Sequence, residues 1–592
     1  MRMNLLQLLE QHFFGLLRQW TAEPASYVAM IKAAQEPRYG DYQANFAFAL
    51  AKTLGKDARD LAREIIDRVQ WGNVIERMEI AGPGFINFHL RTDWLADQVR
   101  AMAGDSRLGV AQADPPRTFV IDYSPRNVAK PLHVGHLRST IIGDSLARQL
   151  RFLGHRVITD NHLGDWGTHF GILLYGYKHF LDAEAFRRDP IQELTRLYIH
   201  VRNLMKAEED VDEENHANPV AEAARQETAK LHAGDPENVR LWQMFLPWCR
   251  QEIEHIYQRL DVRFDHTLGE SFYNKMLPEV VQSLEERGIA RKGEGGAIVV
   301  GPEESPALVR KKDGAYTYTT SDLATIWHRV EQFRPDAILY VVGAPQALHF
   351  KNLFETARRW GYDKVALEHI SFGSVLGADR RPLATREGGA VELGQLLDEA
   401  VHRGEQVYEE SRAQREALGR PVPVLSPEEQ RAIAEVVGIG AVKYADLVQN
   451  RTSDYVFNWD KMLATDGNTA TYMQYAYARN RSIFRVGQEN ETLYRTDPPD
   501  VSLNHPTERA LALQLLRFSE SLVAAAADYR PNIITAYLWD VAKAYSAFNN
   551  ACDVLKAESP ALRQSRLLLC DLTARVVQKG LDLLGIKTVE RM

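Results

Sequence analysis

The sequence predicts an α/β fold class: a Rossmann-like domain built on a parallel sheet, with an α+β domain before it and an all-α domain after it. In the middle of the chain, the apolar runs FVIDY (119–123) and AILYVV (337–342) are each followed by a loop and a helical pattern. This order is typical of a parallel sheet whose binding crevice lies at the carboxyl ends of its strands. The last part of the chain has helical periodicity and little strand signal, which indicates a helical bundle.

Composition shifts divide the chain into four predicted regions. Residues 1–105 mix helical and strand-like patterns and lead into a polar stretch. Residues 117–410 hold the sheet, with a helical insertion at about 183–250. After a proline-rich linker, 425–506 form a helical connecting region and 507–592 a terminal helical domain.

Three segments of the sheet domain carry more specific predictions. Apolar residues at helical spacing follow the first strand, and ISFGSVLG (370–377) is expected to be a third strand. The charged stretch at 206–232 is expected to be a solvated helix without chemistry of its own. The apolar positions of the first helix are Leu137, Ile141, Leu146, Leu150 and Leu153.

The composition indicates a globular protein of a reducing compartment. The 592 residues are 45% hydrophobic and 25% charged, enough for several domains with their own cores. The three cysteines lack CxxC spacing, which argues against a disulfide scaffold and a zinc site. The N-terminus is predicted to be an amphipathic helix rather than a signal peptide, and no run reaches transmembrane length. We therefore expect a cytoplasmic protein with no membrane partner.

The net charge of -8 neither supports nor excludes a nucleic-acid ligand, since an average can hide a basic face.

A cluster of chemistry-bearing residues lies between the first strand and its helix. His133 and His136 flank Gly135, with Lys130 just before them. Glycine lets a polyphosphate approach the backbone closely, and two imidazoles can donate hydrogen bonds to oxygens on which charge develops. The motif alone also fits a structural turn, so its flanks decide the interpretation.

The flanking residues 120–150, VIDYSPRNVAKPLHVGHLRSTIIGDSLARQL, resemble the arginyl-tRNA synthetase family of class I aminoacyl-tRNA synthetases. Blocks in the same order extend the resemblance over nearly the whole chain. These blocks are RYGDYQANFAFALAK, AGPGFINFHL, DNHLGDWGTHFG, YTYTTSDLAT, VVGAPQALHF, YMQYAYARNRSI, AYSAFNNACDVL and the terminal VERM.

The resemblance implies an arginine–tRNA ligase that makes an arginyl-adenylate from L-arginine and ATP and transfers arginine to tRNA(Arg). Mg²⁺ enters with ATP as co-substrate, no tightly bound metal is expected, and a monomer is the family habit. The implied catalytic residues are Lys130, His133 and His136. The ATP site adds Gly135, Arg381, Thr385 and Arg386. The arginine site comprises Asp122, Ser124, Asn127, His133, Tyr318, Asp322 and Gln346, and the tRNA contacts are Tyr472, Tyr475, Arg479, Tyr545 and Met592.

The chemistry of arginine agrees with this site, since its guanidinium is a planar cation with five donors that favours a carboxylate and an aromatic neighbour.

Two departures from the family pattern stand out. Most relatives have SSPN before the histidines, whereas this chain has Ser124-Pro125-Arg126-Asn127. Arg126 either points away from the cation site or contacts phosphate. In the loop after ISFGSVLG, Ala384 stands where class I enzymes usually have a lysine, and Lys130 or the loop arginines are candidates to replace its charge.

Several residues also fit a purely structural role. His162, His169 and His349 could be hydrogen-bonded core residues. The stripe of Tyr472, Tyr475 and Arg479 could pack one helix on another, and the same ambiguity applies to Tyr545.

Two other functions stay open at this stage. A cysteinyl enzyme is the nearest alternative among class I synthetases, but it needs a set of zinc-binding cysteines that this chain lacks. A non-catalytic paralogue that binds tRNA would be consistent with Ala384, while the retained histidines argue against it.

Overall fold

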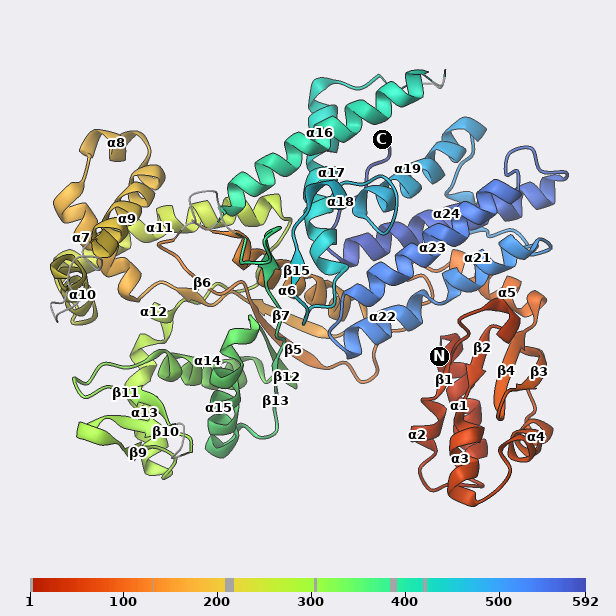
Figure 1. Ribbon diagram of the computed structural model, residues 1–592, viewed down its shortest axis with the longest axis horizontal. Coiled ribbons are helices and arrows are strands. Elements are labelled where there is room, and N and C mark those ends of the chain that lie inside the picture. Colours follow the sequence, from red (N-terminus) through yellow and green to blue (C-terminus); the bar gives the residue numbers. More distant parts are fainter. Residues whose placement is uncertain are drawn as a thin grey trace.

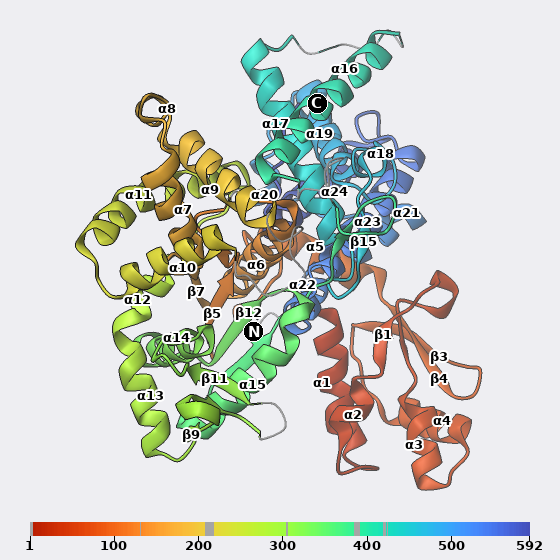
Figure 2. The same ribbon diagram turned by 60° about the vertical axis from the view of Figure 1, so that its left-hand side comes forward.

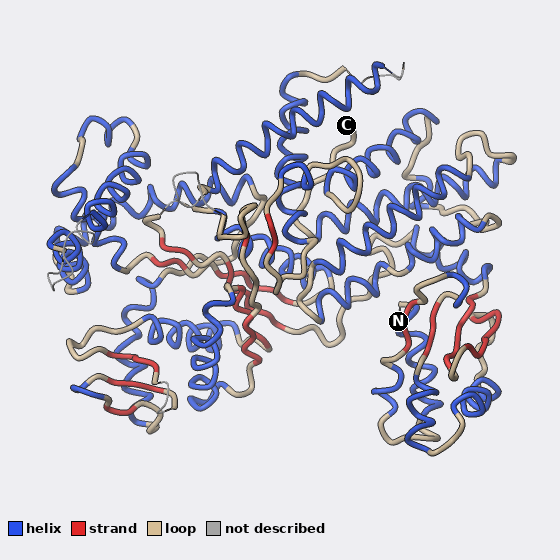
Figure 3. Tube along the Cα trace, in the orientation of Figure 1, coloured by secondary structure: helices blue, strands red, loops and turns tan. Residues whose placement is uncertain are grey.

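The computed structural model describes residues 4–130, 132–207, 218–302, 306–383, 391–417, 419, 422 and 424–591. The N-terminal unit lies at one end of the molecule and a group of helices built from the insertion at the other, with the main sheet between them (Figure 1). Strands occur in the N-terminal unit, in the centre and in a small outlying sheet, and the C-terminal part is helical (Figure 3). The predicted fold class is confirmed.

The N-terminal unit is an α+β structure, as predicted. Helix α1 begins after Asn4, whose side chain caps it, and buries an apolar stripe of Leu5, Leu9, Phe13 and Leu17. This stripe packs near a four-stranded antiparallel sheet of order β1-β2-β4-β3. The elements are α1 (Leu5–Leu17), α2 (Pro24–Val28), β1 (Ile31–Ala33), β2 (Tyr42–Ala44), α3 (Phe46–Leu54), α4 (Ala58–Arg68), β3 (Ile75–Ala81), β4 (Phe85–Leu90) and α5 (Thr92–Ala103).

Charged contacts attach this unit to the C-terminal helices. Arg509 donates to both carboxylate oxygens of Asp41 at 2.8 and 2.7 Å, the bidentate geometry that favours arginine at such junctions. The Tyr42 hydroxyl and the Leu6 N–H both donate to Glu520. The first hundred residues and the last hundred are therefore in direct contact, although the region of the parallel sheet separates them in sequence.

The main sheet is parallel, with order β13-β12-β5-β7. The two predicted strands are present, and every residue of β12 is buried, as expected for a strand covered on both faces. The strands are β5 (Thr118–Tyr123), β7 (Arg156–Asp160), β12 (Ala337–Val341) and β13 (Ala366–His369).

The predicted third strand at 370–377 is only partly correct. The sheet uses β13, just before the segment, although Ile370 still donates to the Tyr340 carbonyl oxygen of β12 and Phe372 bridges Gly343 just beyond it. Farther on, β14 (Val375–Leu376) pairs with β15 (Tyr455–Val456). A Cβ atom added to Gly373 would lie 2.6 Å from the Asp454 carboxylate and 2.7 Å from the Ser453 backbone, so this part of the segment packs on the loop at 450–454.

Helix α6 (Val134–Phe152) follows β5 as predicted and is buried on almost every side. Four of the five predicted apolar positions lie within it, and Leu153 is its C-cap residue. It packs on β5, β7 and β12 and on helices from the C-terminal region. The Ser145 hydroxyl donates to the Leu583 carbonyl oxygen, so α6 also contacts the end of the chain.

The insertion consists of α7 (Thr168–Phe180), α8 (Ala183–Arg188), α9 (Pro190–Ala207), α10 (Pro219–His232) and α11 (Pro236–Arg259). The helix expected at 206–232 is present in part as α10, which packs one face, with Ala224, Thr228 and Leu231, on α7 and leaves most of its other residues exposed or partly exposed. Residues 208–217 of that stretch lie outside the described part. Before the insertion, the short strand β6 (Arg126–Asn127) pairs with β8 (Leu163–Gly164). After it come the helices α12 (Glu270–Tyr273), α13 (Leu277–Glu286), α14 (Tyr318–Phe333) and α15 (Ala347–Ala357). A small sheet between α13 and α14 consists of β9 (Arg291–Lys292), β10 (Ile298–Val300) and β11 (Ala307–Arg310).

The C-terminal region is a set of packed helices, as predicted, and Figure 2 shows it beside the N-terminal unit from a second direction. Its helices are α16 (Leu393–Ala417), α17 (Pro427–Leu447), α18 (Trp459–Met462), α19 (Ala470–Gly487), α20 (Leu493–Thr496), α21 (Pro506–Leu516), α22 (Phe518–Ala527), α23 (Asn532–Ala551) and α24 (Pro560–Leu583). The segment Pro506–Ala527 is apolar and long enough to span a membrane by composition alone. Half of it is buried inside the protein, where α21 and α22 pack on α23.

Candidate functional site

The carboxyl ends of β5 and β12 meet at one edge of the sheet, where Tyr123 is in register with Val341. Ser139 of α6 joins both ends: its hydroxyl donates to the Val341 carbonyl oxygen at 2.6 Å and accepts from the Ser124 N–H at 2.8 Å. The amino end of α6 therefore lies at the crevice where α/β sheets bind their ligands.

His133 and His136 form a capping box at this helix end. The Nδ1 atom of His133 accepts from the Gly135 N–H at 3.1 Å, and the Nδ1 atom of His136 accepts from the His133 N–H at 3.2 Å. With Nδ1 accepting, each neutral ring carries its proton on Nε2. The two ring centroids are 3.9 Å apart. The capping box thus fixes two adjacent rings in the same tautomer.

Both histidines stay neutral at ordinary pH. Burial lowers the pKa of His136 to about 3, and the neighbouring His133 ring and the Arg126 guanidinium act in the same direction. Burial, Lys130 and Arg126 lower the pKa of His133. Two neutral Nε2–H donors at a helix amino end suit a phosphate oxygen, since the helix dipole adds positive potential there.

Two cations lie within electrostatic range of the histidines, and a third lies within range of one of these cations. Lys130 precedes the motif, Arg126 lies in β6, and Arg202, the third, belongs to α9 of the insertion. Burial and the Arg202 charge lower the pKa of Lys130, so these two side chains lie within electrostatic range of each other. Sequence reasoning missed Arg202, because it lies in no matched block and only the folding of the insertion brings it here.

The predicted guanidinium-binding residues come together beside β12. The Asp322 carboxylate, on α14, lies 2.6 Å from Nε2 of His349, on α15. The Tyr318 ring is 5.0 Å from the His349 ring and 67% exposed, and Gln346 is exposed at the start of α15. His349, for which the sequence allowed a core role, therefore lies between two predicted site residues.

Sequence reasoning also missed Glu270, the first residue of α12. Burial raises the pKa of its carboxyl, and the charges of Asp165 and Asp322 raise it further while His162 lowers it. Of its two acidic neighbours, Asp165 is already engaged by Ser271 and by Arg250. The carboxylates of Glu270 and Asp322 thus lie within electrostatic range of each other.

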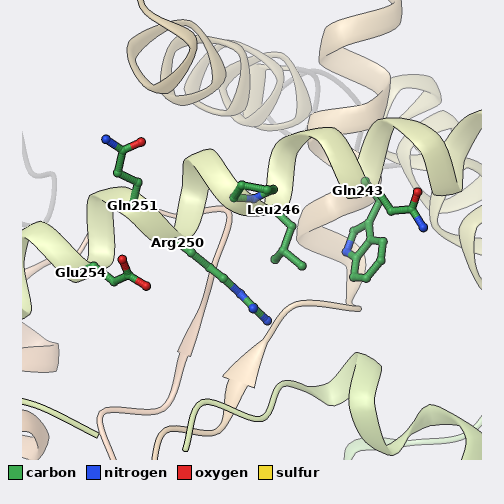
Figure 4. A pocket seen from close by; sticks show the side chains of 7 residues that line it. Gln243, Leu246, Arg250, Gln251 and Glu254 are labelled. Atoms are coloured by element: carbon green, nitrogen blue, oxygen red, sulfur yellow. The ribbon is translucent and has the colours of Figure 1, made fainter.

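Arg250 of α11 lines a shallow pocket of about 370 Å³ (Figure 4). Its guanidinium pairs with Asp165 at 3.3 Å. Trp242 of the same helix donates through Nε1 to the Asp165 carbonyl oxygen at 2.7 Å. These bonds hold the loop around Asp165 against the insertion.

Two of the predicted arginine-binding side chains are engaged beneath the site. Asp122 accepts from Arg329 at 2.8 Å, and Arg329 also pairs with Asp160 in a fully buried group. Ser124 has a φ of 60°, and its buried hydroxyl bonds to Thr140 and Tyr257.

Asn127, the third of this group, is partly exposed in β6 and lies against Gly164. A Cβ atom at Gly164 would lie 2.3 Å from the Asn127 side-chain oxygen, so a larger residue there would displace that side chain. Of Asp122, Ser124 and Asn127, only Asn127 is partly exposed.

The loop that carries the altered class I motif returns directly to the histidines. Arg381 is exposed, whereas Ala384, Thr385 and Arg386 lie outside the described residues. After the loop, the Val134 N–H donates to the Val391 carbonyl oxygen at 2.9 Å, and the Leu393 N–H donates to the Leu132 carbonyl oxygen at 2.8 Å. The residues just after the loop are therefore joined directly to the backbone of the motif.

The predicted tRNA contacts differ in accessibility. On α19, Tyr472 and Tyr475 are partly exposed and Arg479 is exposed, with no ion pair to any described residue. Tyr545 of α23 is only 3% exposed and packs near Phe548. Met592 lies outside the described part.

Three family models match consecutive parts of the chain. The N-terminal domain of arginyl-tRNA synthetase matches residues 7–90, the catalytic domain of class I (R) tRNA synthetases residues 98–459, and the DALR anticodon-binding domain residues 473–592.

Whole-length relatives give the same result. An arginine–tRNA ligase of Rhodopirellula baltica is 42% identical, with all of both chains covered. The crystal structure of arginyl-tRNA synthetase from Plasmodium falciparum has a TM-score of 0.77 at 27% identity and covers 95% of this chain and 94% of its own. The Thermus thermophilus arginyl-tRNA synthetase shares the fold, with a TM-score of 0.81, 24% identity and coverage of 99% and 100%. The chain belongs to the arginyl-tRNA synthetase family of class I aminoacyl-tRNA synthetases.

Proposed function

We propose that this protein attaches L-arginine to tRNA(Arg) at the expense of ATP, through an arginyl-adenylate. The observation that carries the proposal is the pair of neutral, tautomer-fixed imidazoles at the amino end of α6, where the carboxyl ends of β5 and β12 meet. This helix end suits a polyphosphate, and the Asp322 and Glu270 carboxylates suit a guanidinium.

In the first step, a carboxylate oxygen of arginine attacks the α-phosphorus of ATP, and the bond to the β-phosphate breaks to release pyrophosphate. His133, His136 and Lys130 would stabilise the charge that develops on the phosphate oxygens. Gly135 would allow close approach of the backbone, and Arg381, Thr385 and Arg386 would contact the phosphates from the loop. In the second step, a ribose hydroxyl of the terminal tRNA nucleotide attacks the arginyl carbonyl carbon and AMP leaves.

Mg²⁺ would enter bound to ATP. Among the residues that the structure describes, no group of three or more His, Cys, Asp or Glu side chains is arranged to hold a metal ion. Divalent magnesium commonly takes its ligands from substrate phosphates and water, which fits this arrangement.

Arginine would be selected by its side chain. Asp322 and Glu270 would pair with the guanidinium, Tyr318 would lie against its plane, and Gln346 would line the pocket. Asn127 would be available to the α-amino or α-carboxylate group, while Asp122 and Ser124 would shape the floor beneath it.

For tRNA, we propose contacts through Tyr472, Tyr475 and Arg479 on α19, with Tyr545 and Met592 as the further residues that the family resemblance indicates. The N-terminal unit would contact the outer corner of the tRNA. We also propose that the protein is a cytoplasmic monomer, which size-exclusion chromatography with light scattering would test.

Arginine-dependent ATP–pyrophosphate exchange, run with and without tRNA(Arg), tests this function together with tRNA charging. We expect exchange with arginine and little with lysine, and charging of tRNA(Arg) alone. Tight binding of tRNA(Arg) without exchange or charging would instead identify a non-catalytic paralogue.

A further inference from the structure

Arg126 is a buried cation whose side chain lacks hydrogen-bond partners. It lies in β6 and is 5% exposed, and its Nε, Nη1 and Nη2 atoms all lack a partner among the described residues. A buried guanidinium normally pairs, because leaving its donors unsatisfied is costly. Its position therefore calls for an anion that the protein itself does not supply.

The groups around Arg126 define where that anion would bind. Three of these groups, Cys249, Glu252 and Tyr257, belong to α11 and lie in electrostatic range of Arg126. The Arg126 charge also lowers the pKa values of His133 and His136. The guanidinium thus lies within electrostatic range both of α11 and of the amino end of a helix 19 residues long.

Glu252 is the one acidic group among these neighbours, and it does not satisfy Arg126. No hydrogen bond or ion pair joins the two side chains in the described part of the chain. Burial raises the pKa of Glu252, and the Arg126 charge opposes this shift without overcoming it. Glu252 therefore leaves the three guanidinium nitrogens of Arg126 without a hydrogen-bond partner among the described residues.

We propose that Arg126 completes the phosphate site at the amino end of α6 and donates to the pyrophosphate portion of ATP, an inference that rests on the proposed function. By the family resemblance, Arg126 stands where the usual pattern has no cation, and Ala384 stands where the class usually has a loop lysine. With Lys130, Arg126 makes a second cation within electrostatic range of the two histidines. A guanidinium can hold two phosphate oxygens at once, which a flexible ammonium cannot.

The test compares Arg126→Met with Arg126→Lys, and uses Arg188→Met, an exposed arginine of α8, as the matched control. In ATP–pyrophosphate exchange we expect Arg126→Met to raise the KM for ATP and for pyrophosphate about 10- to 100-fold, the usual effect of one lost charged hydrogen-bond donor. The KM for arginine should change less than about twofold, and Arg126→Lys should recover part of the loss.

Thermal unfolding supplies a readout independent of catalysis. Without ligand, Arg126→Met should have an unchanged or higher Tm, because it removes an uncompensated buried charge. Magnesium pyrophosphate should raise the Tm of the wild type and of Arg188→Met, but not that of Arg126→Met.

The two outcomes that overturn the inference are distinct. If Arg126→Met lowers the Tm, keeps both KM values and behaves like Glu252→Gln, the two residues form a structural ion pair. If all the variants keep wild-type KM values and pyrophosphate stabilisation, Arg126 has no part in phosphate binding. Absence of exchange in the wild type would instead contradict the proposed function, and the pyrophosphate-induced shift in Tm would still decide the role of Arg126.

Discussion

The backbone N–H of His133 donates to Nδ1 of His136 at 3.2 Å, which makes each histidine part of the other's environment. This bond caps the helix and leaves the His136 proton on Nε2. One interaction thus serves both folding and chemistry, and variants of His136 test the two roles separately.

His136→Ala should lower the kcat for arginyl-adenylate formation about 100- to 1000-fold, because a donor to developing charge is lost. The affinity for tRNA(Arg) should change little. Single-turnover measurements and filter binding check the two quantities. A variant that kept most of its activity would remove the ring from the mechanism.

Acid should destabilise the protein through the same ring. The pKa of His136 is about 3 in the folded state and 6.5 in the unfolded state, so only the unfolded state binds the proton between these values. The free energy of unfolding should therefore fall as pH drops from about 6.5 to 3, with His136 contributing up to about 1.4 kcal/mol per pH unit. Urea titrations of wild type and His136→Gln across this range should show a shallower slope for the variant. Equal slopes would mean that the folded ring titrates normally.

Asp322→Asn should raise the KM for arginine steeply and leave the KM for ATP nearly unchanged. A desolvated guanidinium that loses one charged partner costs roughly 2–5 kcal/mol. Glu270→Gln should act in the same direction, since its charge lies within range of Asp322. Exchange kinetics with each substrate varied in turn measure the effect, and equal effects on both substrates would indicate that Asp322 is structural.

Lys130→Ala should slow adenylate formation severely if Lys130 compensates for the alanine at 384. In that background, Ala384→Lys should recover part of the loss, because it restores a cation to the loop. Pre-steady-state formation of adenylate measures both. A mild effect of Lys130→Ala, or an equal defect from Arg381→Ala alone, would contradict this role.

Replacing Arg479 by alanine should affect tRNA binding, whereas replacing Tyr545 by alanine should affect the stability of the fold. Arg479→Ala should weaken tRNA binding and reduce its salt dependence without changing the Tm, since Arg479 is exposed and pairs with no described acid. Tyr545→Ala should destabilise the fold by about 3–5 kcal/mol, as a buried aromatic side chain does on truncation. Binding titrations at two salt concentrations and thermal unfolding separate the cases. Unchanged tRNA binding by Arg479→Ala would exclude this face of α19.

Much of the fold could be predicted from local pattern. The apolar run of β12 and the helical spacing of Leu137 and Ile141 both follow from the periodicity of buried strands and helices. The segment at 370–377 has the same strand-like composition, yet Gly373 docks on the loop at 450–454. No local pattern distinguishes a segment that joins the sheet from one that packs on a distant loop.

The sequence by itself determined the family, the main strands and the histidine motif, because these depend on residues that are close together in the chain. Only the tertiary structure decided which side chains share the crevice. It brought Arg202 and Glu270 within electrostatic range of predicted residues, buried Asp122 and Tyr545, and left the buried Arg126 without a hydrogen-bond partner among the described residues. The physical reason is that burial and electrostatic range depend on contacts between elements far apart in sequence, and those contacts exist only once the helices have packed on the sheet.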